Sequence, residues 1–105
     1  MTDRRCVILL FFDLPMTTRK NKKDYTQFRK FLKKNGYVYI QKSVLIKLIH
    51  NSSFAEKEIT KLKCASPEKG TVYALPVCIS NFMKLHSVSG KNFDFDFFTG
   101  NTIYI

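Results

Sequence analysis

The sequence has no tryptophan and only four glycines and three prolines. No linker, internal repeat or low-complexity segment interrupts its 105 residues. Because single domains usually run to about 100–150 residues, we expect one domain over residues 1–105. Ten phenylalanines and five tyrosines are enough to build a core without tryptophan.

No apolar run is long enough to cross a bilayer. The longest, residues 6–12, is far shorter than the roughly 20 residues that a membrane helix requires. Arg4 and Arg5 precede this run, but the Asp-Leu-Pro that follows it does not resemble the cleavage region of a signal peptide. We therefore expect a cytoplasmic protein with no membrane partner.

Cysteines are few, odd in number and not arranged in a CxxC motif. Cys6 and Cys78 lie in apolar, strand-like runs, where cysteine behaves as a small hydrophobic residue, and Cys64 lies apart from both. This usage is typical of a reducing compartment. It predicts neither a disulfide framework nor a thiolate metal site.

Acidic residues are scarce: the chain has 8 Asp and Glu against 18 Lys and Arg, a formal net charge of +10. This balance favours a polyanionic partner, because each Lys or Arg beside a phosphate releases condensed counterions. The alternative interpretation is a small basic protein that is merely soluble.

The first third of the chain predicts a strand and then a helix. Residues 5–12 form the continuous apolar run of a strand buried on both faces, and Pro15 ends it. From about Asn21 the apolar residues recur at spacings of three and four, which is typical of a helix. Thr18 or Asn21 is the expected N-cap, and Gly36 the expected C-terminal stop. The apolar stripe consists of Tyr25, Phe28 and Leu32.

Residues 37–49 are predicted as one long strand, or as two strands joined at a kink near Lys42 and Ser43. Residues 51–66 form a second helix, for which Ser52 or Ser53 is the expected N-cap. Glu56, three residues after Ser53, completes a capping box.

Residues 70–79 form a further strand, in which Pro76 indicates a sheet edge or a bulge. The resulting order of strand, helix, strand, strand, helix, strand is that of ferredoxin-like folds. We therefore predict an α+β fold with an antiparallel sheet and its helices on one face. The other face needs a cover, and a two-fold partner that presents the same face is the simplest one.

Most of the positive charge lies between residues 19 and 34. This segment has eight basic residues and one acidic residue, Asp24, which leaves +7 of the total +10. A solvated helix face normally intersperses acids for i,i+4 pairs, and like charges at these spacings repel by roughly a few tenths of a kcal/mol per pair. We predict that the segment binds phosphates by shape, since it has no Asn or Gln array to read bases. The basic residues are Arg19, Lys20, Lys22, Lys23, Arg29, Lys30, Lys33 and Lys34.

Asp13 directly follows the first apolar run. An aspartate at a strand end is commonly a turn former that accepts a backbone hydrogen bond from two residues on. The alternative is a metal ligand, held rigidly beside the most basic loop. One carboxylate alone holds Mg²⁺ poorly, but a two-fold dimer doubles it. On this alternative, two copies of Asp13 share a cation where the strand ends meet at the axis.

The remaining polar groups have less specific patterns. Asp94 and Asp96 alternate with phenylalanines, so they are expected on the wet face of an amphipathic strand. His50 and His86 lack a metal-ligand spacing and a nucleophile partner, so we interpret them as surface or interface residues. Ser43 is either a bulge residue or a group that hydrogen-bonds a phosphate.

Three segments together make the chain resemble the Cas2 family of CRISPR-associated proteins, its type II members in particular. They are LLFFDLP (9–15), YTQFRKFLKKNGYVYIQKSVLIKL (25–48) and GTVYALPV (70–77). The resemblance implies a ferredoxin-like homodimer completed by C-terminal strands, about 101–105, that pair across the protomers. It also implies that the dimer lies between copies of a metal-dependent integrase, the first CRISPR-associated protein, and supports duplex DNA during spacer acquisition.

The same resemblance implies a Mg²⁺-dependent endonuclease of RNA or DNA that is dispensable for spacer acquisition. Asp13 is then the catalytic and metal-binding residue, and Phe12, Arg19 and Arg29 match the aromatic and basic residues that support it. The alternative is a stand-alone RNA-binding or RNA-cleaving module of the same fold. Such modules carry a Gly-aromatic consensus on a central strand, most of which KGTVYALPV (69–77) lacks.

Overall fold

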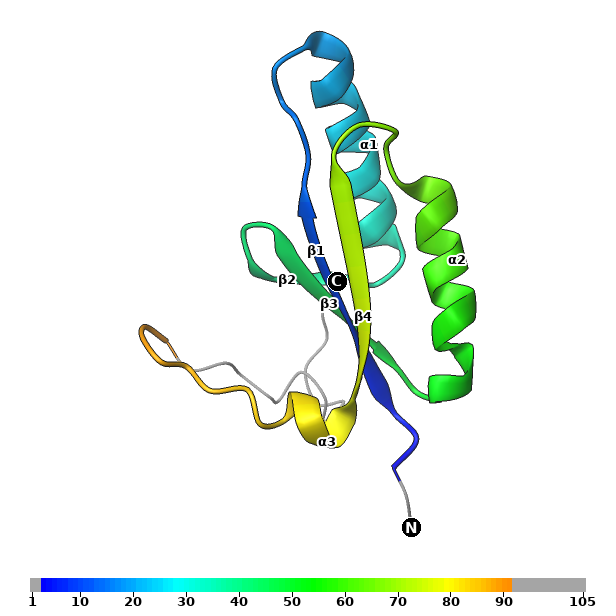
Figure 1. Ribbon diagram of the computed structural model, residues 1–105, viewed down its shortest axis with the longest axis vertical. Coiled ribbons are helices and arrows are strands. Elements are labelled where there is room, and N and C mark those ends of the chain that lie inside the picture. Colours follow the sequence, from blue (N-terminus) through cyan, green and yellow to red (C-terminus); the bar gives the residue numbers. More distant parts are fainter. Residues whose placement is uncertain (1–2, 92–105) are drawn as a thin grey trace.

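The computed structural model describes residues 3–91 (Figure 1). The predicted strand at 101–105, together with Asp94 and Asp96, lies outside the described residues. A 3₁₀ turn, η1 (Ser52–Phe54), precedes the second helix. The elements in chain order are β1 (Cys6–Asp13), α1 (Arg19–Lys34), β2 (Val38–Gln41), β3 (Val44–Ile49), α2 (Ala55–Ala65), β4 (Thr71–Cys78) and α3 (Ile79–Phe82).

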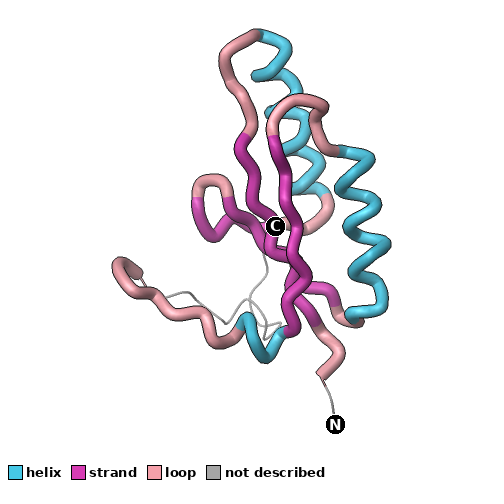
Figure 2. Tube along the Cα trace, in the orientation of Figure 1, coloured by secondary structure: helices cyan, strands magenta, loops and turns pink. Residues whose placement is uncertain are grey.

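The four strands form one antiparallel sheet in the order β2-β3-β1-β4. Helices α1 and α2 lie side by side on one face of the sheet (Figure 2). This arrangement confirms the predicted ferredoxin-like α+β fold. The edge position of β4 confirms the expectation from Pro76, since proline has no N–H for a second ladder.

Strand β1 is central, and its side chains alternate between two apolar clusters. Ile8 and Leu10 are fully buried on the helix side, where they join Phe28 of α1 and Leu62 of α2. Val7, on the other face, is also fully buried. Residues 6–10 are buried or half-buried on both faces, which explains most of the continuous apolar run. Phe11, which is 38% exposed, departs from the expectation that residues 5–12 form a strand buried on both faces.

Helix α1 begins two residues earlier than the apolar pattern suggested. Of the two candidate caps, Thr18 is the N-cap: its hydroxyl accepts a hydrogen bond from the Asn21 N–H at 3.0 Å. Phe28 and Leu32 of the predicted stripe are buried. The helix ends before Gly36, whose φ of 88° lies in the left-handed region that glycine tolerates.

The segment after α1 forms two strands, with Lys42 and Ser43 in the turn between them. This arrangement confirms the second of the two predicted alternatives. The register of the β2–β3 pair shifts between Tyr39 and Gln41, so the irregularity lies within β2. The interpretation of Ser43 as a bulge residue is therefore wrong.

The start of the second helix differs from the predicted capping box. The Asn51 side-chain oxygen accepts hydrogen bonds from the Ser53 N–H at 3.0 Å and from the Ser53 hydroxyl at 2.9 Å. This turn uses both Ser53 donors, so the chain makes the 3₁₀ turn η1 at this point and α2 begins only at Ala55. The prediction of Ser52 or Ser53 as N-cap in a capping box with Glu56 is wrong, because Asn51 caps η1 and α2 itself begins after Phe54 without a side-chain cap.

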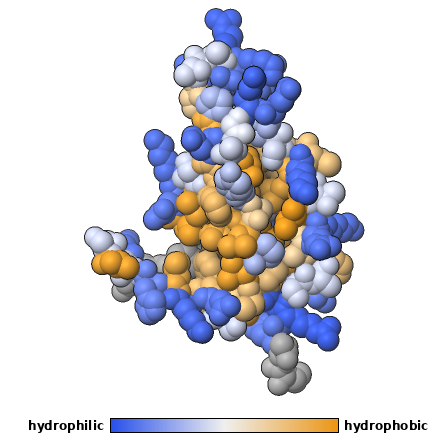
Figure 3. All heavy atoms as spheres, viewed as in Figure 1, coloured by the Kyte–Doolittle hydropathy of each residue, from blue (hydrophilic) through white to orange (hydrophobic). Residues whose placement is uncertain are grey.

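Helix α3 packs on the sheet face opposite α1 and α2. Its Ile79 and Phe82 join Val7 and Ile46 in a second buried cluster. The prediction that the helices share one face therefore holds for α1 and α2 but not for α3. Much of the opposite face remains apolar and open: Figure 3 shows apolar side chains gathered over its middle. The exposed ones include Phe11, Tyr73 and Leu75.

The three cysteines are free, but they differ in exposure. Cys6 is buried, as expected of a small hydrophobic residue, whereas Cys78 is exposed at the end of β4. Cys78 therefore does not behave as a buried small hydrophobic residue, because β4 is an edge strand with a neighbouring strand on one side only. None of the helices among residues 3–91 has the length and apolarity to cross a membrane.

A buried polar cluster joins α2 to the sheet. Glu58, 9% exposed, accepts hydrogen bonds from the Tyr37 hydroxyl at 2.9 Å and from the Lys47 ammonium at 3.0 Å. Lys47 also lies 5.5 Å from the centre of the Tyr37 ring. Burial raises the pKa of Tyr37 most, and the charge of Glu58 and its hydrogen bond raise it further. The hydroxyl therefore remains a donor. The cluster fixes how α2 lies on β3.

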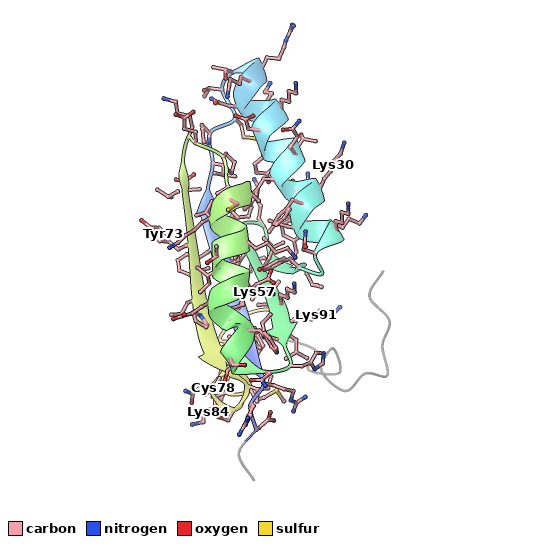
Figure 4. All side chains as sticks on the ribbon, turned by 90° about the vertical axis from the view of Figure 1, so that its right-hand side faces the viewer. Lys30, Lys57, Tyr73, Cys78, Lys84 and Lys91 are labelled. Carbon is pink, nitrogen blue, oxygen red and sulfur yellow. The ribbon has the colours of Figure 1, made fainter. Side chains whose placement is uncertain are left out.

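Replacing Glu58 by alanine is expected to lower the free energy of unfolding by about 2–4 kcal/mol, because it leaves the Tyr37 hydroxyl and the Lys47 ammonium partly buried without a partner. Urea unfolding followed by circular dichroism measures the change. Lys57→Ala, at an exposed position on the same helix (Figure 4), is the control and should change stability by less than about 0.5 kcal/mol. Equal effects of the two variants would contradict a role for the cluster.

Candidate nucleic-acid interface and strand-end carboxylate

The basic residues of α1 lie on its outer half. At about 100° per residue, burial of Phe28 and Leu32 turns the opposite half of the helix outward. All eight predicted basic residues are exposed there. Lys30 points away from the sheet in Figure 4, and Figure 3 shows hydrophilic side chains at the end of the molecule where α1 begins. The structure thus gathers all eight on one surface, which we call the α1 basic face.

Almost none of this charge is neutralised within the described chain. Lys20 pairs with Asp24 at 3.1 Å, one turn along the helix. The other seven residues make no ion pair with any residue in 3–91. The first turn contains no acidic residue, so Arg19, Lys20 and Lys22 also oppose the positive end of the helix dipole. An external anion would relieve both sources of repulsion.

Arg29 is the basic residue of this face that aromatic rings hold in place. Its guanidinium carbon lies 5.7 Å from the centre of the Tyr25 ring and 5.9 Å from that of Tyr39 on β2. Contact with two rings limits the rotamers of the side chain and leaves the edge of the guanidinium free to donate. A planar donor group held in this way suits bidentate binding of a phosphate.

Asp13 is the last residue of β1, opposite Thr71 of β4. Alternation along the strand places it on the same face as Phe11, away from α1. Its side chain is exposed and has no hydrogen bond or ion pair within residues 3–91. The turn-former interpretation is wrong for a simple reason: the residue two positions on is Pro15, which has no N–H to donate. The carboxylate is free to bind a ligand.

Contacts on both sides fix the backbone at Asp13. Gly70 has a φ of 92°, and a Cβ built on it would lie 2.7 Å from the Asp13 carbonyl oxygen and 2.8 Å from Leu14 Cδ2. Only glycine permits this approach. On the other side, the Phe12 N–H donates to the Ser43 carbonyl at 3.1 Å. The strand end is therefore held between the residue that precedes β4 and the β2–β3 turn.

Phe12 and Ser43 support this position rather than line the open face. The Phe12 ring is 7% exposed and packs edge-on against Tyr25 and Phe28, each with a centroid distance of 6.0 Å. It points toward α1, opposite to Asp13. Ser43 contributes its backbone carbonyl to the contact with Phe12. The structure thus brings these two predicted residues together beneath the strand end.

Asp13 is the carboxylate that β1 itself places at this end of the sheet. No three His, Cys, Asp or Glu side chains within residues 3–91 cluster in a way that could hold a metal ion. An exposed, unpaired Asp13 fits Mg²⁺ as one of the one or two carboxylates that this ion usually takes, with phosphate and water as further ligands. His50 and His86 are exposed, as expected of surface residues.

Sequence reasoning missed two residues that position the site, Tyr39 and Gly70. A glycine as the first residue of the strand predicted at 70–79 is a signal for Gly70, since such positions often need a left-handed φ. Tyr39 has no comparable signal. Its contact with Arg29 exists only because β2 lies beside α1, which is a property of the tertiary arrangement.

The fold and the site define a small, basic ferredoxin-like protein with an exposed basic helix face and an unpaired strand-end carboxylate. The family model described as CRISPR associated protein Cas2 matches residues 6–85. The chain is 33% identical over 85 residues to the protein named CRISPR-associated endoribonuclease Cas2 of Treponema denticola, covering 81% of this chain and 84% of that one. It is 36% identical over 84 residues to the protein of the same name in Streptococcus mutans serotype c (strain NN2025), covering 80% and 78%. The chain belongs to the Cas2 family, and its role is CRISPR-associated.

Substituting Gly70 by alanine is expected to lower the free energy of unfolding by about 2–3 kcal/mol, from backbone strain together with a clash against Asp13. Gly90 has a φ of 90° and no atom within 4 Å of a built Cβ, so Gly90→Ala carries the strain without the clash. It should cost about 1 kcal/mol or less. Thermal and urea unfolding of both variants measure the difference, and equal losses would show that the close approach at Asp13 contributes nothing.

Proposed function

We propose that this protein is a subunit for CRISPR adaptation: a cytoplasmic homodimer that binds duplex DNA along its α1 basic faces and supports the integrase during spacer acquisition. The observation that carries the proposal is the α1 basic face, where seven of eight exposed basic residues lack an ion pair within residues 3–91. Such a surface gains free energy by releasing the counterions of a nucleic acid.

The composition of this face favours backbone contacts over base readout. Its groups are lysines and arginines, which position a duplex by its phosphates and carry no sequence information. The 16-residue α1 is about 24 Å long at 1.5 Å per residue. A stretch of duplex as long as α1 carries many phosphates, so several basic residues of this one helix can contact one DNA backbone.

The open sheet face supports the dimer in this proposal. Phe11, Tyr73 and Leu75 are 38%, 59% and 51% exposed, and the Phe11 and Tyr73 rings lie 5.7 Å apart. Burying such a face against a second copy would remove this apolar area from water. It would also bring two copies of Asp13 to the same interface, because Asp13 lies on that face of β1.

Replacing Arg29, Lys30, Lys33 and Lys34 together by alanine is expected to weaken duplex binding by about tenfold to a hundredfold at moderate salt, whatever the DNA sequence. The slope of log K against log salt should fall by up to about 4, since about 0.9 is lost per phosphate contact. Fluorescence anisotropy with two unrelated duplexes across a salt series measures both quantities.

A matched control removes the same charge elsewhere. Replacing the exposed Lys57, Lys61, Lys63 and Lys84 by alanine lowers the net charge by the same amount but leaves α1 intact. This variant should keep most of the affinity and the salt slope. Equal weakening by the two sets would show that net charge, not α1, binds the duplex. Tighter binding of single-stranded RNA than of duplex would favour the stand-alone RNA-binding alternative.

A second candidate activity is a Mg²⁺-dependent endonuclease. It is favoured by the unpaired Asp13 carboxylate and by the relatives, which are named endoribonucleases. Asp13 of each copy would hold the ion together with phosphate oxygens and water. Bound Mg²⁺ would supply electrostatic stabilisation of a phosphoryl group under attack. The basic face would hold the strand, so the two roles use different residues.

Replacing Asp13 by alanine is expected to abolish Mg²⁺-dependent cleavage of RNA and DNA while leaving the salt-dependent binding of duplex unchanged. Gel assays with end-labelled substrates, with and without chelator, measure cleavage. Glu68→Gln is the control, because Glu68 is an exposed acid in the loop before β4 and its loss should not affect the rate. Cleavage that survives in the Asp13 variant would assign the activity elsewhere.

A further inference from the structure

Cys6 and Cys78 face each other across two paired strands. They are opposite residues in the register of β1 and β4. The Ile79 N–H donates to the Arg5 carbonyl at 3.1 Å. In an antiparallel ladder, a bond at this position means that Cys6 and Cys78 form a non-hydrogen-bonded pair. In such pairs the Cα atoms lie only about 4.5 Å apart and the side chains are closest. That separation is within the range that a disulfide spans.

The two thiols are unequal. Cys78 is exposed, and its sulfur lies 3.4 Å from the Ser80 hydroxyl oxygen. The hydrogen bond with Ser80, then one with the Asn81 backbone, lowers the pKa of Cys78, and the charge of Lys84 acts in the same direction. Figure 4 shows Cys78 and Lys84 at the same end of the molecule. Cys6 is 3% exposed, and burial raises the pKa of its thiol.

We propose that Cys6 and Cys78 form a reversible redox pair that responds to peroxides and small disulfides. Cys78 is the residue that meets the oxidant, because it is accessible and closer to its thiolate form. Cys6 is the resolving residue, since its place opposite Cys78 lets it attack without first reaching solvent. Disulfides of this kind in reducing compartments are transient and regulatory.

With hydrogen peroxide as the oxidant, the Cys78 thiolate sulfur attacks one peroxide oxygen. The O–O bond breaks, hydroxide leaves, and Cys78 becomes a sulfenic acid. The Cys6 sulfur then attacks the Cys78 sulfur, its proton leaves with the hydroxyl as water, and the S–O bond breaks as the S–S bond forms. Two thiols are oxidised by two electrons in total, and the peroxide is reduced to two waters. A small thiol reverses the step by exchange.

The test uses the full chain with Cys64→Ser, which removes the unpaired exposed thiol. The reduced protein is treated with hydrogen peroxide or oxidised glutathione, and thiols are counted with a maleimide after denaturation. We expect both thiols to disappear and the intact mass to fall by two hydrogen atoms, with recovery on adding dithiothreitol. Before oxidation, Cys78 in the folded protein should react with maleimide at least about tenfold faster than Cys6.

Two matched variants separate a pair from a single reactive cysteine. With Cys78→Ala in the Cys64→Ser background, Cys6 should stay a free thiol. With Cys6→Ala in that background, Cys78 should retain a glutathione adduct and lose no hydrogen pair. Because Cys6 is buried, circular dichroism first checks that the Cys6→Ala variant folds. If it does not fold, the Cys78→Ala variant alone tests the pair. Two free thiols after oxidation, or a disulfide only between chains, would overturn the proposal.

Discussion

Pairing of β1 on both of its edges is the constraint on which the rest of the structure depends. Because β3 and β4 both bond to it, β1 is central; its helix-side face is buried, and its other face is buried at Val7 but exposed at Phe11. Its alternation then decides which residues face the helices and which face outward. Phe12 turns inward to anchor α1, and Asp13, one residue later, turns outward. A shift of one residue in this register would exchange the two roles.

Burial of one half of α1 has a comparable effect on charge. Once Phe28 and Leu32 are fixed on the core, the lysines and arginines have only the outer half of the helix to occupy. Tyr25 and Tyr39 then restrain Arg29, while the lysines keep their long, flexible stems. The basic face therefore combines one oriented donor group with several adaptable ones. The polar cluster at Glu58 keeps α2 in place beside it.

The order of strands and helices, the buried strand β1 and the apolar stripe of α1 were predictable from the sequence. Their apolar periodicity is local, Pro15 marks the end of the strand, and Gly36 marks the end of the helix. The start of α2 was not, since Asn51, Ser52 and Ser53 all suit an N-cap and only the backbone path selects one. The side taken by α3 depends on packing against Val7 and Ile46, which no local pattern encodes. For the site, the basic residues and Asp13 were evident and Gly70 had a local signal. The contact of Tyr39 with Arg29 required the tertiary arrangement, and the facing cysteines required the strand register.

The two ends of β1 carry different chemistry, a thiol at Cys6 and a carboxylate at Asp13. Seven residue steps at about 3.3 Å separate them by about 23 Å. Ionic screening at physiological salt has a decay length of about 8 Å, so a charge on Asp13 is largely screened at the other end of the strand. One strand therefore carries two reactive groups within a single small domain, and neither lies within reach of what the other binds.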